Sequence, residues 1–268
     1  MRNTTVSELG QSLPIGKEAP GGERLRDFAF KPWRTTEEKA IGKWRDENPS
    51  ASHGQFVAYV LSYFLTRWCG ESFEDVPIDK RRLAMSTSYA CDVLYAWIAL
   101  RRFAMEDNLD MELSCGRCRN VVPYTISLGT IDTKIPDDDD PLTEAFQVRD
   151  GLVWQGKDSR ILTLKPVQWW VYETGSGNMG DLKANVIAGS IAGLDKVEGE
   201  VRIPGEVLDL SKYDLEALTA KINDWEPGPD LSVEVNCPKC DFRIIQSIPW
   251  MFDHFFSLTA SSLSEVRT

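Results

Sequence analysis

Four cysteines form two pairs that could bind a metal ion. Cys115 and Cys118 make the first pair and Cys237 and Cys240 the second, each with two residues between its cysteines. This spacing lets both sulfurs of one turn point at the same ion, so each pair supplies half of a tetrahedron. Together the four thiolates make a set that zinc often takes in closed structural sites. We therefore expect one structural Zn²⁺, with these four cysteines as its ligands.

The two pairs lie far apart in the sequence. They are separated by 118 residues, whereas a compact zinc ribbon has about 15 to 20 residues between its pairs. In one interpretation the intervening segment is an insertion between the two halves of a ribbon, and the metal holds its ends together. In the other interpretation the two turns never meet. Because closing so long a loop is entropically costly, a metal clip there has much to stabilise, and we favour the joint site.

The residues around the two turns are alike. Each turn lies between two strand-like runs, and Gly116 and Pro238 suit tight turns between ligands. Arg117 and Lys239 can offset the negative charge of a zinc tetrathiolate. A hydrolytic zinc keeps an open position and usually has histidine and carboxylate ligands, and a redox Cys-x-x-Cys begins a helix. We therefore expect no catalytic residue and no enzyme.

Other residues with chemical potential carry weaker signals. His53 is expected in a surface loop and His254 within an aromatic helix, as a structural histidine. Residues 175–180 match the spacing Gly-x-Gly-x-x-Gly, but no Rossmann alternation surrounds them, so a flexible loop is expected. The aspartates 137–140 lack the turn residues of a calcium loop and are predicted to be a solvated loop. The sequence thus predicts no small-molecule substrate and no cofactor besides zinc.

The charge of the chain disfavours nucleic acid as a partner. The net charge is −11, from 41 acidic and 30 basic side chains. Such a chain repels phosphate backbones unless it has a concentrated basic patch. The densest basic clusters, Lys80–Arg82 and Arg101–Arg102, lie in helical stretches with acidic neighbours, and we expect them to be solvated helix faces.

The composition is that of a soluble globular protein, with 42% hydrophobic and 26% charged residues. No segment approaches the ~18 to 20 unbroken apolar residues of a membrane span. Residues 1–13 lack a signal-peptide pattern. Six cysteines without an export signal indicate a reducing compartment, where paired cysteines bind metals more often than they form disulfides. The other two, Cys69 and Cys91, are predicted to be core thiols in helices.

Apolar spacing predicts an α+β fold whose N-terminal part is mainly helical. A short strand is expected at 28–33, and helices are expected at 35–47, with a threonine cap, and at 55–69, 77–85 and 88–105. Strand-like segments then lead into and out of each cysteine pair. Between the pairs we expect strands at 146–148, 161–164 and 168–172 and helices at 182–191 and 210–225, the latter capped by Ser211. A strand at 231–235 precedes the second pair, a strand at 242–248 follows it, and an aromatic helix at 250–263 closes the chain.

These elements define five predicted parts of the chain. They are an extended arm that we expect to fold on a partner (1–24), a helical domain (25–110), a first zinc knuckle (111–130), a mixed α/β insertion (131–230), and a second zinc knuckle with the C-terminal aromatic helix (231–268). In this prediction, the two knuckles form a split zinc ribbon.

The order of these features resembles one known family. The features are a Gly/Pro arm, Phe30–Trp33, the Thr-Thr-Glu-Glu helix start at 35–38, a helix ending near Cys69, Val76–Arg81, an Ala/Leu/Arg helix before the first pair, Val235–Cys240 and Phe255–Phe256. In this order the chain resembles the baseplate hub and tail-assembly proteins of contractile-tailed phages and related injection systems. The resemblance covers residues 25–120 and 231–258 best, while residues 130–230 depart from it.

The resemblance implies a non-enzymatic protein that builds or forms a tail baseplate or hub. Its partners would be other tail and baseplate proteins, and it would be found in the virion tail or in the host cytoplasm during assembly. The main alternative is a zinc-ribbon regulator that binds nucleic acid, which needs a basic face. A third is an enzyme built within residues 130–230, which predicts a pocket with converging polar groups and shifted acids.

Overall fold

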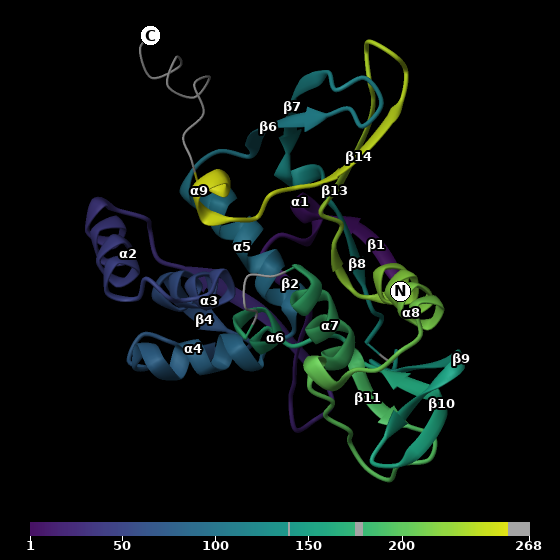
Figure 1. Ribbon diagram of the computed structural model, residues 1–268. Coiled ribbons are helices and arrows are strands. Elements are labelled where there is room, and N and C mark those ends of the chain that lie inside the picture. The colour runs from purple at the N-terminus through teal and green to yellow at the C-terminus, as the bar shows by residue number, and fades with distance from the viewer. Residues whose placement is uncertain (139, 175–178, 257–268) are drawn as a thin grey trace.

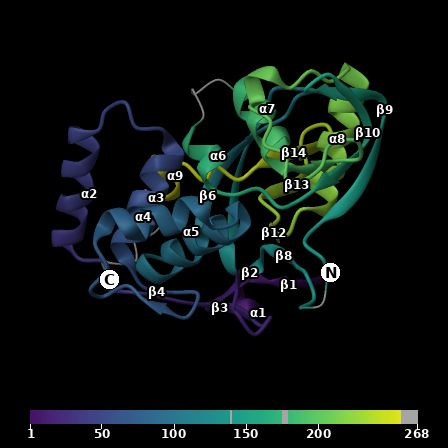
Figure 2. The same cartoon turned by 90° about the horizontal axis from the view of Figure 1, so that it is seen from below.

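The computed structural model describes residues 1–138, 140–174 and 179–256 and has the expected mixed α+β fold. Helices α2 (Thr35–Glu47), α3 (His53–Phe64) and α4 (Ile78–Thr87) lie at one end of the molecule, and the sheet of β9 (Glu144–Trp154) and β10 (Lys157–Leu164) with helices α7 (Met179–Ser190) and α8 (Lys212–Trp225) lies at the other (Figures 1 and 2). A large hydrophobic core joins the N-terminal helices to both cysteine-bearing hairpins, and a second, smaller core lies under β9 and β10.

The N-terminal part combines an antiparallel sheet with helices. The sheet runs in the order β2 (Ser12–Glu18), β3 (Arg24–Phe30), β4 (Leu65–Trp68), β5 (Glu71–Ser72). The helices are α2 (Thr35–Glu47), α3 (His53–Phe64), α4 (Ile78–Thr87) and α5 (Ala90–Ala104). Helix α2 has the predicted bounds, although Arg34 is its N-cap and makes no side-chain bond there, so the predicted threonine cap is wrong.

The helix predicted over 55–69 is too long. Helix α3 ends at Phe64, and the next four residues form β4. Strand β4 pairs with β3, placing Phe28 opposite Trp68, and the two rings pack with centroids 6.4 Å apart. Tertiary pairing with β3 therefore overrides the helical spacing of the aromatic residues. As a result Cys69 lies beyond a strand, with a φ of +47°, rather than in a helix.

Residues 1–24, predicted as an arm, are instead built into the fold. Strand β1 (Arg2–Thr5) pairs with β8 (Asp132–Ile135), the short helix α1 (Val6–Leu9) follows, and β2 pairs with β3. Val6, Leu13 and Ile15 are fully buried. The carboxylate of Asp92 accepts hydrogen bonds from the backbone N–H groups of Ile15 and Gly16, both at 2.8 Å. This segment therefore folds on the rest of its own chain.

The middle of the chain has a core of its own. Strands β9 (Glu144–Trp154), β10 (Lys157–Leu164) and β11 (Ile191–Leu194) form an antiparallel sheet. Helices α7 (Met179–Ser190) and α8 (Lys212–Trp225) contribute to the same core, and the short helical turn η2 (Gly205–Val207) lies against α7. Ser211 caps α8 as predicted, accepting from the N–H of Asp214 at 3.2 Å. The predicted strand at 168–172 is wrong, because this segment forms helix α6 (Trp170–Glu173) with the Trp169 ring stacked on Tyr172.

The C-terminal segment returns to the N-terminal helices. Helix α9 (Phe252–Phe255) lies within the closing aromatic helix predicted over 250–263, and residues 257–263 of that prediction lie outside the described residues. The Phe256 ring packs against Trp97 (centroids 4.7 Å apart) and Trp33 (5.1 Å), and Phe252 packs against Phe56 (5.0 Å). These contacts fix the chain that leaves the second cysteine pair.

Candidate metal centre

Two β-hairpins carry the four cysteines, as predicted. Strands β6 (Asn108–Ser114) and β7 (Val121–Ser127) flank the first pair, and β13 (Ser232–Asn236) and β14 (Arg243–Ser247) flank the second. Alternating residues of β6 point inward, so that Leu109 and Leu113 are buried while their neighbours face outward. The two hairpins lie side by side at the top of Figure 1.

The two turns have the same backbone structure. In the first, the N–H of Cys115 donates to Asn120 O and the N–H of Arg119 donates to Cys115 O, both at 2.9 Å. In the second, the N–H of Cys237 donates to Phe242 O at 2.9 Å and the N–H of Asp241 to Cys237 O at 2.8 Å. The residue after the second cysteine is left-handed in both, with φ of +57° at Arg119 and +55° at Asp241. Two copies of one turn therefore face each other.

The four sulfurs converge on one point. All four Sγ atoms lie within 4.8 Å of one another. Two contacts cross between the turns, with Cys115 Sγ 3.7 Å from Cys240 Sγ and Cys118 Sγ 3.7 Å from Cys237 Sγ. Metal–sulfur bonds of about 2.3 Å in a regular tetrahedron place the sulfurs about 3.8 Å apart. The structure thus brings together all four predicted ligands, and the interpretation in which the turns never meet is wrong.

The electrostatics of the cluster favour a cation. The N–H of Cys118, followed by that of Arg117, stabilises the Cys115 thiolate and lowers the pKa of Cys115 to about 6. The N–H of Phe242 acts in the same way on Cys240, but burial and hydrogen bonding to the other three sulfurs outweigh it and raise the pKa of Cys240 to about 12. Cys115 therefore loses its proton readily, whereas the ionisation of Cys240 is disfavoured. A metal ion replaces the protons and lets all four sulfurs ionise.

A glutamine joins the two hairpins beside the cysteines. The Gln246 side chain on β14 donates from Nε2 to Glu112 O on β6 at 3.2 Å, and its Oε1 accepts from the N–H of Ser114 at 3.4 Å. The side-chain amide thus takes the place of a neighbouring strand's peptide group at the open edge of β6. Sequence reasoning missed this residue, because a glutamine in a short strand has no distinctive signal of its own.

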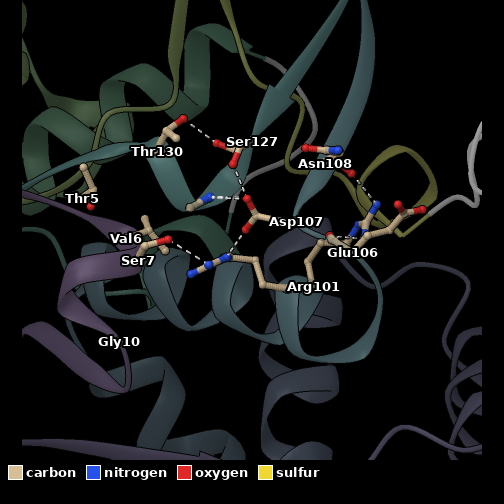
Figure 3. A network of polar contacts seen from close by, with 12 residues as sticks. Thr5, Val6, Ser7, Gly10, Arg101, Glu106, Asp107, Asn108, Ser127 and Thr130 are labelled. Atoms are coloured by element: carbon tan, nitrogen blue, oxygen red, sulfur yellow. Dashed lines mark hydrogen bonds and ion pairs between the residues drawn. The ribbon is translucent and has the colours of Figure 1, made fainter.

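Arg101 anchors the chain below both hairpins, which corrects the predicted solvated face. It is only 1% exposed. Its guanidinium donates to Glu106 O at 2.8 Å, to Asn108 O at 3.2 Å and to Phe255 O. The first two carbonyls lead into β6, and the third belongs to α9. One buried cation therefore connects the entry to the first knuckle with the chain that follows the second, and its contacts with Glu106 and Asn108 are visible in Figure 3.

Asp107 fixes the base of the first hairpin beside Arg101 (Figure 3). Its carboxylate accepts hydrogen bonds from Arg102 and from Ser127 at the end of β7, and from the N–H of Gly129 at 3.3 Å in the helical turn η1 (Leu128–Thr130). Arg102 also donates to Ser7 Oγ at 3.0 Å. These bonds hold both strands of the hairpin to the N-terminal segment and to α5.

The remaining predicted residues lie elsewhere. His53 is the first residue of α3 rather than a surface loop, its ring packs 4.7 Å from that of Trp250, and burial lowers its pKa. The side chain of His254 and residues 175–178 lie outside the described part of the chain. In the aspartate tract, Asp138 pairs with Arg26 at 2.8 Å. Cys69 and Cys91 are buried, as expected of core thiols.

Comparison with known proteins provides no relative. Neither the protein-family models nor the searches of curated proteins and of solved structures give a match to the chain. Within the described residues, every helix is too short or too polar to cross a membrane.

Proposed function

We propose that Cys115, Cys118, Cys237 and Cys240 hold one structural Zn²⁺. The observation that carries this proposal is the convergence of four sulfurs from two facing turns. Zinc has no geometric preference from its d electrons and often takes four thiolates as a closed tetrahedron. Because four cysteines fill that shell, no coordination position is left for water or substrate.

We further propose that the two hairpins are the halves of a split zinc ribbon, with residues 131–230 inserted between them. The matching hydrogen bonds of the two turns and the Gln246 bridge support this arrangement. The zinc would then hold together two ends of a long insertion, and its role would be to keep the fold rather than to act on a substrate.

Cobalt substitution tests the metal proposal. Protein refolded with Co²⁺ should show the intense visible absorption of a tetrahedral thiolate complex, and one equivalent of Zn²⁺ should bleach it. The variant Cys237→Ser, which removes one sulfur, should shift and weaken these bands. Octahedral cobalt spectra, or bands that Cys237→Ser leaves unchanged, would contradict a four-sulfur site.

We propose that the protein serves as a structural or assembly component of a contractile-tail baseplate or hub, with other tail proteins as partners. The order of sequence features that resembles this family supports the proposal, as does a closed metal shell that stabilises without catalysing. The nine tryptophans are consistent with extensive contacts, since tryptophan is over-used at protein interfaces. The protein would reside in the virion tail or in the host cytoplasm during assembly.

Mass spectrometry of purified tail particles, and of tails stalled during assembly, tests this role. We expect the chain in at least one of these fractions together with other tail proteins. Its presence in both would indicate a structural component, and its presence only in stalled tails would indicate an assembly factor. Absence from both, together with recovery on nucleic acid, would favour the zinc-ribbon regulator instead.

A further inference from the structure

A cavity of about 450 Å³ lies where three parts of the chain meet. Its walls come from α5, α6, the end of α8, β12 (Gly228–Pro229) and both strands of the second hairpin. We call it the Glu226 cavity. Its lining includes Cys91, Leu94, Tyr172, Asn223, Glu226 and Pro227. Its volume is within the range of pockets that hold small molecules, which often form where separate parts of a fold meet.

Two acidic side chains line this cavity, Glu226 and Asp230, and the exposed Asp230 accepts hydrogen bonds from the N–H and Oγ of Ser232 at 3.0 and 2.6 Å. One carboxylate oxygen of Glu226 accepts from the N–H of Val167 at 3.2 Å. Among the described residues, no lysine, arginine or histidine nitrogen pairs with its carboxylate. Burial, opposed only by the Val167 bond, raises its pKa to about 7. The carboxylate is half-buried, and its hydrogen bond from Val167 leaves its second oxygen free to accept another.

The lysine that lines this cavity bonds to backbone carbonyls instead of pairing with Glu226. Lys134 lines the cavity, but its Nζ donates to Asp224 O at 2.6 Å and to Asn223 O at 3.4 Å. These carbonyls belong to the last turn of α8, where the helix dipole is negative. Glu226 follows directly as the C-cap of the same helix. Helix end and carboxylate together favour a positive charge in the cavity.

Two further titratable groups of the cavity, Tyr172 and Cys91, are neutral. Burial, and then the charge of Glu226, raise the pKa of the Tyr172 hydroxyl. Burial, followed by the charges of Asp92 and Glu226, raises the pKa of the Cys91 thiol. Both groups keep their protons at neutral pH, so neither can act as an anion or supply the missing cation. Leu94, Pro227 and the Tyr172 ring add apolar walls.

We propose that the Glu226 cavity binds a small organic amine, with its ammonium group on the Glu226 carboxylate and its apolar body against Leu94, Pro227 and Tyr172. A protonated amine provides the charge that Glu226 lacks and the hydrogen-bond donors that its free oxygen can accept. The cavity resembles the pocket expected for an activity within residues 130–230, but α5 and the second hairpin line it as well. This binding site goes beyond the zinc and assembly roles and does not depend on them.

Calorimetric titration with n-butylammonium chloride at pH 8, where Glu226 is mostly ionised, tests the proposal. We expect saturable binding of one equivalent to the wild-type protein. Glu226→Gln keeps the size of the side chain and a carbonyl oxygen for the Val167 N–H, and it should weaken binding at least about tenfold. The matched control Glu216→Gln removes the same charge from an exposed position on α8 and should bind like wild type.

The neutral analogue n-butanol separates a charge-based site from a merely apolar one. It should bind at least about tenfold more weakly than the amine. A second readout is the backbone amide resonance of Val167, which should shift on addition of amine to wild type and stay in place with Glu226→Gln. Unchanged far-ultraviolet circular dichroism and zinc content will show that this variant is folded. Equal affinity in Glu226→Gln, equal affinity for butanol, or no binding at millimolar amine would overturn the proposal.

Discussion

Removing the metal clip should lower the thermal stability of the whole protein. The double variant Cys115→Ser, Cys237→Ser takes one sulfur from each turn, so neither turn keeps a complete pair. One sulfur contact of this clip joins Cys115 and Cys240, which are 125 positions apart. In the unfolded chain a link over a loop of this size removes about 5 kcal/mol of conformational entropy. Loss of the link therefore stabilises the unfolded state by about that amount.

The corresponding shift in melting temperature follows from the size of the chain. At about 2.1 cal/mol/K per residue, 268 residues unfold with an entropy of about 0.56 kcal/mol/K. A loss of about 5 kcal/mol then lowers the melting temperature by about 9 °C. Loss of the metal–sulfur bonds themselves adds to this value, so about 9 °C is the smallest shift that the structure predicts.

Differential scanning calorimetry with and without a chelator measures this shift. Chelation should lower the melting temperature of wild type toward that of the double variant and should leave the double variant unchanged. Cys69→Ala, which removes a buried thiol outside the cluster, is the control and should keep its zinc and melt within about 3 °C of wild type. A double variant that melts within about 2 °C of wild type, or that retains a full equivalent of zinc, would refute the reasoning.

Three further predictions follow from single contacts. Gln246→Glu removes the side-chain donor to Glu112 O and should speed zinc release to a chelator about fivefold, as measured by metal-indicator kinetics. An unchanged release rate would show that the Gln246 hydrogen bonds do not support the metal site. Gly228→Ala should lower the free energy of unfolding in urea by about 2 to 4 kcal/mol, because φ at Gly228 is +121° and the new Cβ would lie 2.5 Å from Cys91 Cβ. The control Gly156→Ala, at φ +75° with no atom within 4 Å of the new Cβ, should lower it by only about 1 kcal/mol. Similar losses in the two variants would contradict a clash at Gly228. Burial raises the pKa of Asp92 from 3.8 to about 6, so the folded protein binds more protons than the unfolded chain between about pH 4 and 6. Its free energy of unfolding should therefore fall by up to about 3 kcal/mol as the pH rises through this window. If the difference in unfolding free energy between wild type and Asp92→Asn does not change with pH, the pKa shift is absent.

Local signals in the sequence located the metal ligands and most elements. The Cys-x-x-Cys turn between two alternating runs depends on residues within about ten positions, and both hairpins formed as predicted. Helix α2 (Thr35–Glu47) and the Ser211 cap of α8 also depend on nearby residues. The prediction that the two turns meet came from their chemistry rather than from their spacing in the sequence. Each turn supplies only two of the four ligands that a tetrahedral metal site needs.

The errors occurred where distant segments decide the local structure. Leu65–Trp68 has helical spacing but pairs with β3, and residues 1–24 have few apolar residues but pair with β3 and β8. Arg101 looks like a surface arginine until the carbonyls of Glu106, Asn108 and Phe255 surround it. Such partners lie in segments that no local pattern brings together.

The most direct test of the metal centre is elemental analysis combined with X-ray absorption spectroscopy of the purified protein at the zinc edge. We predict one zinc ion per chain, surrounded by four sulfur neighbours at about 2.3 Å, with neither oxygen nor nitrogen bound to the metal. A chain purified without metal that does not take up zinc, or a zinc ion with oxygen or nitrogen ligands, would contradict this prediction.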